Sequence, residues 1–265
     1  MLLQMRSLLL ALFLSGAFVA SYGADEPKIR AFDIKTIESL GKELYQRDLL
    51  AAKGEDLLFE KRPEARTVPL RGWITEITKD VSNVYMIQET DAGLSLAYVV
   101  AFPEKGEPSV EDKRGAEIPK AILTRYQARK TGIAAIHKFF KRTYNFEVLD
   151  DPDGSGFLVY ALASTTDANE IVVGGHFRVS VSANGEKAKQ VDALSNSLLI
   201  LQKAPRDQPK DSKTVGYAMS HLVSSTPVET HVFVSLANDI PLFVATPDKI
   251  VWKVESGSIK KVKAK

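Results

Sequence analysis

Apolar and polar positions form their clearest pattern between residues 144 and 201, where they predict β-strands. Residues 157–163 are almost continuously apolar, as expected of a strand that is covered on both faces. Residues 171–182 and 187–201 give two further strand patterns, and Asn184-Gly185 between them suits a tight hairpin turn. This stretch therefore predicts a three-stranded antiparallel meander.

The second of these predicted strands carries the most interesting polar cluster, because its side chains alternate between two faces. The apolar face holds Phe177, Val179 and Val181, and the polar face holds His176, Arg178, Ser180 and Ser182. Gly174-Gly175 comes just before, and glycines inside a strand mark a bulge or a close backbone approach. Two interpretations follow: a bent strand with a polar outer face, or a binding site that includes His176 and Arg178.

Two stretches show the three- and four-residue spacing of apolar positions that is typical of an amphipathic helix. The first spans residues 33–61, where Asp33 is placed to cap the start and Gly54 to interrupt the helix. Its apolar stripe consists of Ile34, Ile37, Leu40, Leu44 and Tyr45. The second spans residues 119–142 and begins with proline, which fits a first helical turn. Its apolar stripe consists of Ile118, Ile122, Tyr126, Ile133, Ile136 and Phe140.

The remaining segments predict short strands, turns and one short helix. The expected strands cover residues 70–78, 83–89, 94–102, 231–236, 240–245 and 249–255, with a last strand after Ser256-Gly257. Residues 104–117 predict an exposed loop, and residues 214–222 a short helix. Because helices and hairpins are segregated along the chain, we predict an α+β fold. It consists of an antiparallel β-sheet of hairpins or meanders with two longer helices packed against it.

The N-terminus has the pattern of a secretory signal peptide over residues 1–23. Arg6 precedes an apolar core, and Ser21 and Gly23 supply small residues before a cleavage site at Ala24. The alternative is an uncleaved anchor, but the apolar run is shorter than the roughly 20 residues that a spanning helix needs. We therefore predict a periplasmic or secreted protein with no transmembrane segment after signal cleavage.

Composition limits the class of the mature chain, which has about 240 residues, enough for one large domain or two smaller ones. We expect a helix and β-hairpin region at 24–118 and a helix and meander region at 119–265. These form two lobes joined near 103–118, or one continuous domain. The chain has no cysteine, so its core has to be stable without disulfides. The net charge of +2 falls to +1 when Arg6 is removed, which argues against a nucleic-acid-binding protein.

The second predicted helix carries charge of one sign, since no acidic residue lies between Glu117 and Glu147. The basic residues of this stretch are Lys120, Arg125, Arg129, Lys130, Lys138, Lys141 and Arg142. Arg125 and Arg129 are one turn apart and face the same way. They are candidate binding residues for a phosphate, a polyanion or an acidic partner. The alternative is a solvated helix face without a specific ligand.

Several segments resemble an uncharacterised family of secreted bacterial proteins. They are TRYQARKTGIAAI before YNFEVLDD, then GFLVYALAST, VVGGHFRVSVSANG and HLVSSTPVETHVFVSL, ending in DKIVWKVE. These segments cover most of residues 120–255. The resemblance implies a shared fold but brings no catalytic residues, because no activity is assigned to that family. Its members often carry cysteines where this chain has Phe139 and Leu198, which implies that a disulfide position is lost here.

Motifs for metal binding are sparse. The histidines are His137, His176, His221 and His231, and no pair has the spacing of a zinc-binding helix. Glu229 and His231 share one face of a predicted strand. They would hold zinc only if they met His176 and His221 across the sheet. The alternative is a set of separate surface or hydrogen-bonded histidines.

Motifs for nucleophilic catalysis are also sparse. The chain lacks both G-x-S-x-G and cysteine. A grouping of Ser195, His176 and Asp192 can be drawn, but their spacing gives no support for a triad. Residues 150–156 (DDPDGSG) are too acidic for a phosphate loop and lack the ligand spacing of an EF-hand.

These observations predict an exported, non-catalytic binding protein of the bacterial periplasm or cell envelope. Its partner is expected to be a protein or an envelope component, and neither a cofactor nor a metal is expected. The candidate binding residues are Arg125, Arg129, His176 and Arg178. The alternative is a hydrolase with a site around His176 and Arg178 that includes His231. That alternative requires these three residues and Glu229 to converge in one pocket.

Overall fold

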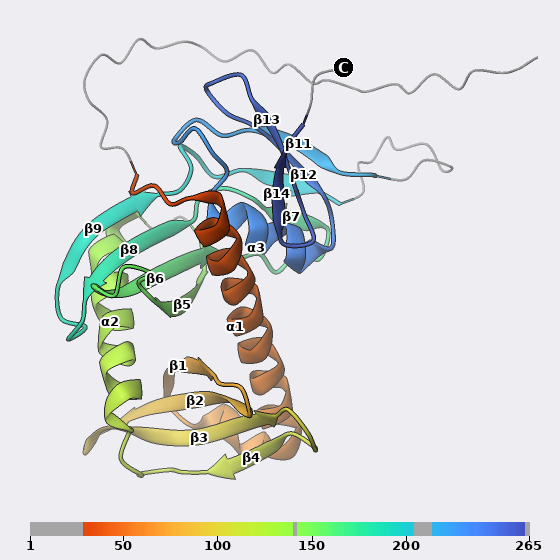
Figure 1. Ribbon diagram of the computed structural model, residues 1–265. Helices are drawn as coiled ribbons and strands as arrows, with labels where there is room; N and C mark the ends of the chain where they lie inside the picture. The colour runs from red at the N-terminus through yellow and green to blue at the C-terminus, as the bar shows by residue number, and fades with distance from the viewer. Residues whose placement is uncertain (1–28, 140–141, 204–213, 263–265) are drawn as a thin grey trace, which may run out of the picture.

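The computed structural model describes residues 29–139, 142–203 and 214–262. Within this part of the chain, three α-helices and fourteen mostly antiparallel strands form open sheets, which confirms the predicted α+β class (Figure 1). The predicted signal peptide, residues 1–23, lies outside the described residues. Among the helices that are described, none combines the length and the hydropathy needed to cross a bilayer.

The first predicted helix is confirmed as α1 (Ile34–Lys61). The Asp33 carboxylate accepts a hydrogen bond from the Thr36 backbone N–H at 2.9 Å, as the capping prediction requires. The predicted interruption at Gly54 is wrong, because the helix continues to a short 3₁₀ turn, η1 (Pro63–Thr67). Gly54 instead allows close packing: a Cβ atom there would lie 3.2 Å from the Val84 side chain.

The first sheet is an antiparallel meander of β1 (Leu70–Ile77), β2 (Val81–Thr90), β3 (Gly93–Pro103) and β4 (Ser109–Asp112), in that order. Three of these strands were predicted, whereas β4 lies in the segment 104–117 that was expected to be an exposed loop. Val84 and Tyr98 on one face pack with Leu58 of α1. The opposite face contributes Ile74 and Ile87 to a different core.

The second sheet contains β5 (Tyr144–Asp150), β6 (Gly156–Ala163), β8 (Phe177–Ser182) and β9 (Ala188–Ala193), in the order β5-β6-β8-β9. The predicted strands 171–182 and 187–201 are each broken in two. Their outer pieces, β7 (Glu170–Val172) and β10 (Ile200–Gln202), pair with each other as a separate ribbon. The chain leaves the sheet at Gly174-Gly175, because Gly175 adopts a φ of +87° that strands do not allow.

The polar outer face predicted for this strand is wrong. Side chains do alternate along β8, but both faces of the sheet are covered. Val159 and Val179 pack under α2 (Lys120–Ile136) on one face, and Tyr160 packs with α1 and α3 on the other. His176 and Arg178 are therefore buried, at 1% and 0% exposure.

The C-terminal sheet has the order β11 (Tyr217–Ser220), β12 (Leu242–Ala245), β13 (Val251–Glu255) and β14 (Ser258–Lys261). Strands β11 and β12 are parallel, and α3 (Glu229–Asn238) makes the crossover between them. The predicted helix at 214–222 and the predicted strand at 231–236 are both wrong. Residues 229–235 are buried all round the helix, so the stretch has no exposed polar face, and its β-branched Thr230, Val232 and Val234 are typical of a strand.

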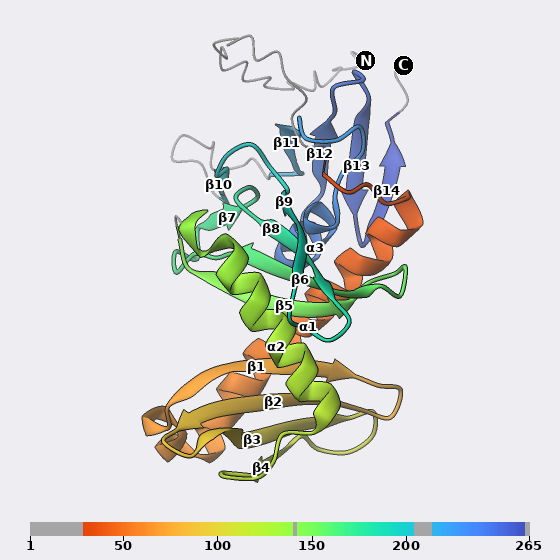
Figure 2. The same cartoon turned by 90° about the vertical axis from the view of Figure 1, so that its left-hand side faces the viewer.

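Both long helices connect the first sheet with the rest of the molecule (Figures 1 and 2). The second helix, predicted at 119–142, is confirmed as α2 and ends in a 3₁₀ turn, η2 (His137–Phe139). The core beneath α2 combines Ile74 and Ile87 of the first sheet with Phe146 and Val159 of the second. The predicted regions 24–118 and 119–265 therefore share a hydrophobic core.

Candidate functional site

Arg178, at the centre of the second sheet, is held by two buried carboxylates. Its Nε and Nη2 atoms lie 3.0 and 2.6 Å from Oδ2 of Asp192 on β9. Its Nη1 lies 2.5 Å from Oε1 of Glu229, at the start of α3. The Tyr160 hydroxyl donates to the same Glu229 oxygen at 2.8 Å. Two buried carboxylates therefore compensate the charge of Arg178.

The segment before α1 closes this network. The Arg30 carbonyl accepts a hydrogen bond from Arg178 Nη2, and the Arg30 guanidinium pairs with Asp151 at 2.5 Å. The centroid of the Phe32 ring lies 4.7 Å from the guanidinium carbon of each arginine. These contacts cover the network from outside, so it is a sealed part of the interior.

Three histidines border the same buried region. His176 Nδ1 accepts from the Ala163 N–H at 3.0 Å, and its Nε2 has no partner among the described residues. The rings of His221 and His231 meet edge to face at 4.8 Å. Burial lowers the pKa of His176 and of His221 to about 4. Burial, followed by the charges of His221 and His176, lowers the pKa of His231 well below its ordinary value. All three are therefore neutral at pH 7.

The residues required by the hydrolase alternative do come together, but not in an open pocket. His176, Arg178, Glu229 and His231 are each at most 4% exposed. Asp192 binds Arg178, and the Ser195 hydroxyl accepts from the Gly175 N–H at 2.7 Å, so the grouping of Ser195, His176 and Asp192 does not form a triad. No cluster of histidines and carboxylates able to hold a metal ion exists within the described residues.

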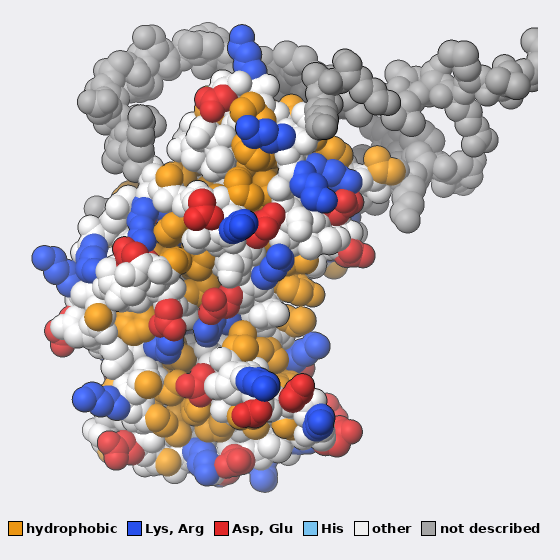
Figure 3. All heavy atoms as spheres, viewed as in Figure 1, with side chains coloured by type: hydrophobic (Ala, Val, Ile, Leu, Met, Phe, Trp, Pro, Cys, Tyr) orange, Lys and Arg blue, Asp and Glu red, His pale blue; other side chains and the backbone are white. Residues whose placement is uncertain are grey.

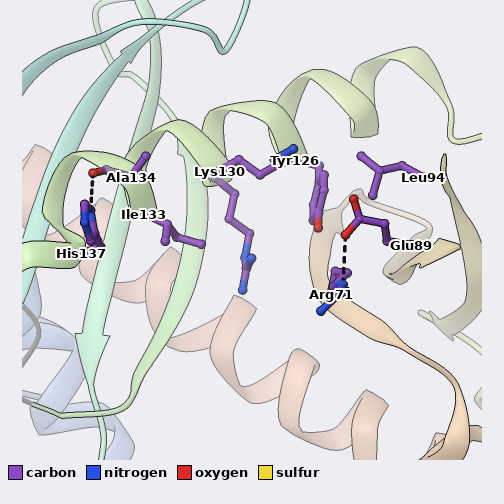
Figure 4. A pocket seen from close by; sticks show the side chains of 9 residues that line it. Arg71, Glu89, Leu94, Tyr126, Lys130, Ile133, Ala134 and His137 are labelled. Carbon is purple, nitrogen blue, oxygen red and sulfur yellow. Dashed lines mark hydrogen bonds and ion pairs between the residues drawn. The ribbon is translucent and has the colours of Figure 1, made fainter. Parts of the chain in front are cut away.

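An open groove lies elsewhere, between α2 and the first sheet. Its volume is about 470 Å³. It is lined by Arg71, Glu89, Leu94, Tyr126, Arg129, Lys130, Ile133, Ala134 and His137. Figure 4 shows His137 bonded back to the Ala134 carbonyl at one end and the Arg71–Glu89 pair, 3.1 Å apart, at the other. We refer to it as the α2 groove.

Arg129 lies in the wall of the α2 groove without an anionic partner. The residue is 8% exposed, and within the described chain its guanidinium makes no hydrogen bond or ion pair. Its Nε atom is fully buried and unsatisfied. The rings of Phe146 and Trp73 lie 5.3 and 5.7 Å from the guanidinium carbon. Burial lowers the pKa of Arg129 from its ordinary value, though a guanidinium still stays charged.

A glycine in β1 creates the space for this guanidinium. A Cβ atom at Gly72 would lie 2.8 Å from Cζ and Nη1 of Arg129 and 2.9 Å from Nη2. The near-equal distances mean that the guanidinium lies flat on the Gly72 backbone. Gly72 has a φ of +138° and sits at a register shift in the β1–β2 pairing. A side chain is excluded there by both space and conformation.

Glu147 on β5 is the carboxyl group whose charge acts on the pKa of Arg129, but the two side chains are not paired. The Glu147 side chain is buried and accepts a hydrogen bond from the Trp73 indole N–H at 3.0 Å. Burial raises the pKa of Glu147 to about 7, so the carboxyl is largely protonated in mildly acidic solution. It forms no ion pair with Arg129.

Arg125, the other candidate on this helix, has a different environment. It pairs with Asp150 at 2.8 Å and lies 5.3 Å from the ring of Phe157. The structure thus separates the four candidate binding residues: His176 and Arg178 are in the interior, Arg125 is paired, and Arg129 alone lines the groove. Sequence reasoning missed Gly72, although a glycine inside a strand pattern was the available signal.

Comparisons with protein-family models, with curated proteins and with solved structures find no match. The function is therefore inferred from the geometry of this chain.

Proposed function

We propose that the protein is an exported, non-catalytic binding protein of the bacterial periplasm or cell envelope, which meets its partner at the α2 groove. The observation that supports the proposal is Arg129, a nearly buried cation that lines an open groove without a compensating anion. An unpaired buried charge is unfavourable in a fold. An anionic group on the partner supplies the missing compensation, which makes binding favourable.

The charges around the α2 groove support a local site. Figure 3 shows acidic and basic side chains interspersed over the one face in view. Lys130 at the edge of the groove is exposed and forms no ion pair with another described residue. Arg71 on the opposite edge is already paired with Glu89. Recognition is therefore assigned to Arg129 and Lys130.

The hydrolase alternative depends on His176, Arg178 and His231. The buried network around Arg178 supports a structural role for these residues instead. A hydrolase needs a reacting group that a substrate and water reach. Arg30, Phe32 and α3 cover the network, so a substrate has no path to it in this conformation.

Capture from an envelope extract tests the proposed function. The chain from residue 24 onward, tagged at its C-terminus, is incubated with solubilised envelope, and bound molecules are identified by mass spectrometry. We expect at least one species that the parent protein enriches, that Lys130→Glu loses and that Lys105→Glu retains. Lys105 is the matched control because it is exposed and does not line the groove.

Two results would overturn the proposal. One is the absence of any species whose capture depends on Lys130. The other is hydrolysis of chromogenic esters, amides or phosphates above the buffer rate that disappears in His176→Ala. The mass of the exported product separately tests cleavage before Ala24.

A further inference from the structure

We infer that the α2 groove binds a small organic carboxylate with an apolar body, and that the carboxylate pairs with Arg129. This inference rests on the proposed function and specifies the chemistry of the ligand. It follows from three features of the groove: the orientation of the guanidinium, the apolar lining, and the charges at the rim.

The orientation of Arg129 favours a planar anion. One face of the guanidinium covers the Gly72 backbone, and its planar edge carries the N–H groups that have no acceptor within the described chain. Two parallel N–H groups on one edge match the two oxygens of a carboxylate in a bidentate pair. The aromatic rings of Trp73 and Phe146 fix the guanidinium in place, so little conformational entropy is lost on binding.

The lining of the groove favours an apolar body next to this head group. Leu94, Tyr126 and Ile133 contribute apolar surface beside Arg129. The volume of about 470 Å³ lies within the range of small-molecule sites, which are mostly apolar with a few polar groups that set the orientation. A bare inorganic anion leaves this apolar surface exposed to water and therefore gains less on binding.

The rim charges favour a monoanion over a dianion. Glu89 lies at the edge of the groove and occupies Arg71, so Arg129 and Lys130 are the cations left for a ligand. A phosphate monoester carries close to two negative charges at neutral pH, and Glu89 repels the second of them. A single carboxylate satisfies Arg129 and leaves Lys130 to attract the ligand from solution.

Calorimetric titration with matched eight-carbon probes and one short carboxylate tests the inference. The eight-carbon probes are octanoate, octyl phosphate, octylamine and octanol, and acetate is the carboxylate without an apolar chain. We expect octanoate to bind most tightly, since only it combines a planar monoanion with an apolar chain. Arg129→Gln should weaken octanoate binding by about 10- to 100-fold, the usual effect of losing hydrogen bonds to a charged group. Arg114→Gln is the control, because Arg114 pairs with Asp112 outside the groove.

A second readout locates the bound ligand. The chain has two tryptophans, and the Trp73 indole lies beside Arg129 whereas Trp252 is in the C-terminal sheet. In a proton–nitrogen NMR spectrum, octanoate should shift the Trp73 indole signal and leave the Trp252 signal in place. Lys130 is exposed, so we expect Lys130→Glu to fold like the parent and to weaken binding several-fold, and the test does not depend on Arg129 variants alone.

The outcomes separate this inference from the proposed function. Tighter binding of octyl phosphate overturns the carboxylate assignment, and equal binding of octylamine or octanol overturns the ionic head group. Octanoate binding that is unchanged in Arg129→Gln also overturns it. If no probe binds while envelope capture still depends on Lys130, the inference fails and the proposed function stands. If capture and probe binding are both absent, both fail.

Discussion

Arg129 and Arg178 are the same residue type in opposite electrostatic surroundings. Arg178 is enclosed by Asp192 and Glu229, and its pKa is raised above the ordinary value: burial opposes the charge, and the nearby anions outweigh it. Arg129 is buried against glycine and aromatic rings without such an anion, and its pKa is lowered by burial. Arg178 is therefore expected to stabilise the fold, whereas Arg129 is expected to lower its stability.

Replacing each arginine by methionine tests this contrast, because methionine keeps most of the side-chain volume and removes the charge. At pH 6, Arg129→Met should raise the free energy of unfolding by about 1 kcal/mol, since an unpaired buried charge is removed. Arg178→Met should lower it by about 3–5 kcal/mol, since two carboxylates are left without their partner. Urea unfolding measures both values. A decrease for Arg129→Met would mean that its charge is compensated in the fold, contrary to the basis of the α2 groove.

At the scale of elements, close helix packing positions the residues of the interior. α3 crosses α1 at Gly41, where a Cβ atom would overlap the Cβ of Val232 and lie 2.7 Å from the Glu229 carbonyl. This close approach seats the start of α3, and with it the Glu229 carboxylate, against β8. Gly132 of α2 plays a similar role against Val159 of β6.

Substitution of Gly41 tests the importance of this crossing. Gly41→Ala forces α1 and α3 apart, and we expect the free energy of unfolding to fall by about 1–3 kcal/mol, as for other overpacked sites. The expected loss opposes the gain that alanine normally gives over glycine in a helix. Lys53→Ala, at an exposed position of α1, is the control and should change stability by less than about 0.5 kcal/mol. Equal stability of Gly41→Ala and the parent would exclude a tight crossing.

At the scale of the whole molecule, α1 and α2 connect cores that contain buried titratable groups of opposite pH response. Glu147 belongs to the region between the first and second sheets, where it faces Trp73, Asp48, Arg47 and Arg129. The histidine pair lies in the upper part, beside α3. Because the helices couple these regions, protonation at either place affects the stability of one folded unit.

The pH dependence follows from the signs of the pKa shifts. His176 and His221 titrate near pH 4 in the folded protein and near 6.5 when unfolded. Between pH 4 and 6.5, these histidines bind protons in the unfolded chain but not in the folded protein. The free energy of unfolding therefore falls as the pH drops from 6.5 towards 4. The pKa of Glu147 is about 7 in the folded protein, against an ordinary value of 4.5. Its contribution to the free energy of unfolding is therefore complete below pH 4.5 and is lost as the pH rises towards 7.

Glu147→Gln separates the two contributions. In this variant, the free energy of unfolding should rise from pH 4 to 6.5 and then level off. Glutamine cannot ionise, so the loss of stability that ionisation of Glu147 causes in the parent is removed. Relative to the parent, the variant should gain on the order of 3 kcal/mol between pH 4.5 and 7. Urea unfolding across pH 4–8 on both proteins measures the difference. A difference that stays constant with pH would show that Glu147 titrates normally in the fold.

Local signals predicted much of the architecture but little of the site. The Asp33 cap, the helix periods and the Asn184-Gly185 turn depend on neighbours in sequence, and the structure confirms them. The α3 helix was missed because residues 229–235 are buried all round, so the stretch has no exposed polar face, and its β-branched residues are typical of a strand. The sequence identified Arg129 as a candidate residue. It did not reveal that the Arg129 guanidinium would lie against Gly72, which belongs to another element.

The sequence by itself determined the α+β class, the two long helices and three of the four strands of the first sheet, because hydrophobic periodicity and capping act over a few residues. Only the tertiary structure decided which polar residues lie inside. Arg125 and Arg129 are one turn apart, yet Arg125 is paired near the surface and Arg129 is buried under a distant strand. Burial depends on what covers a side chain, and that cover comes from parts of the chain far away in sequence.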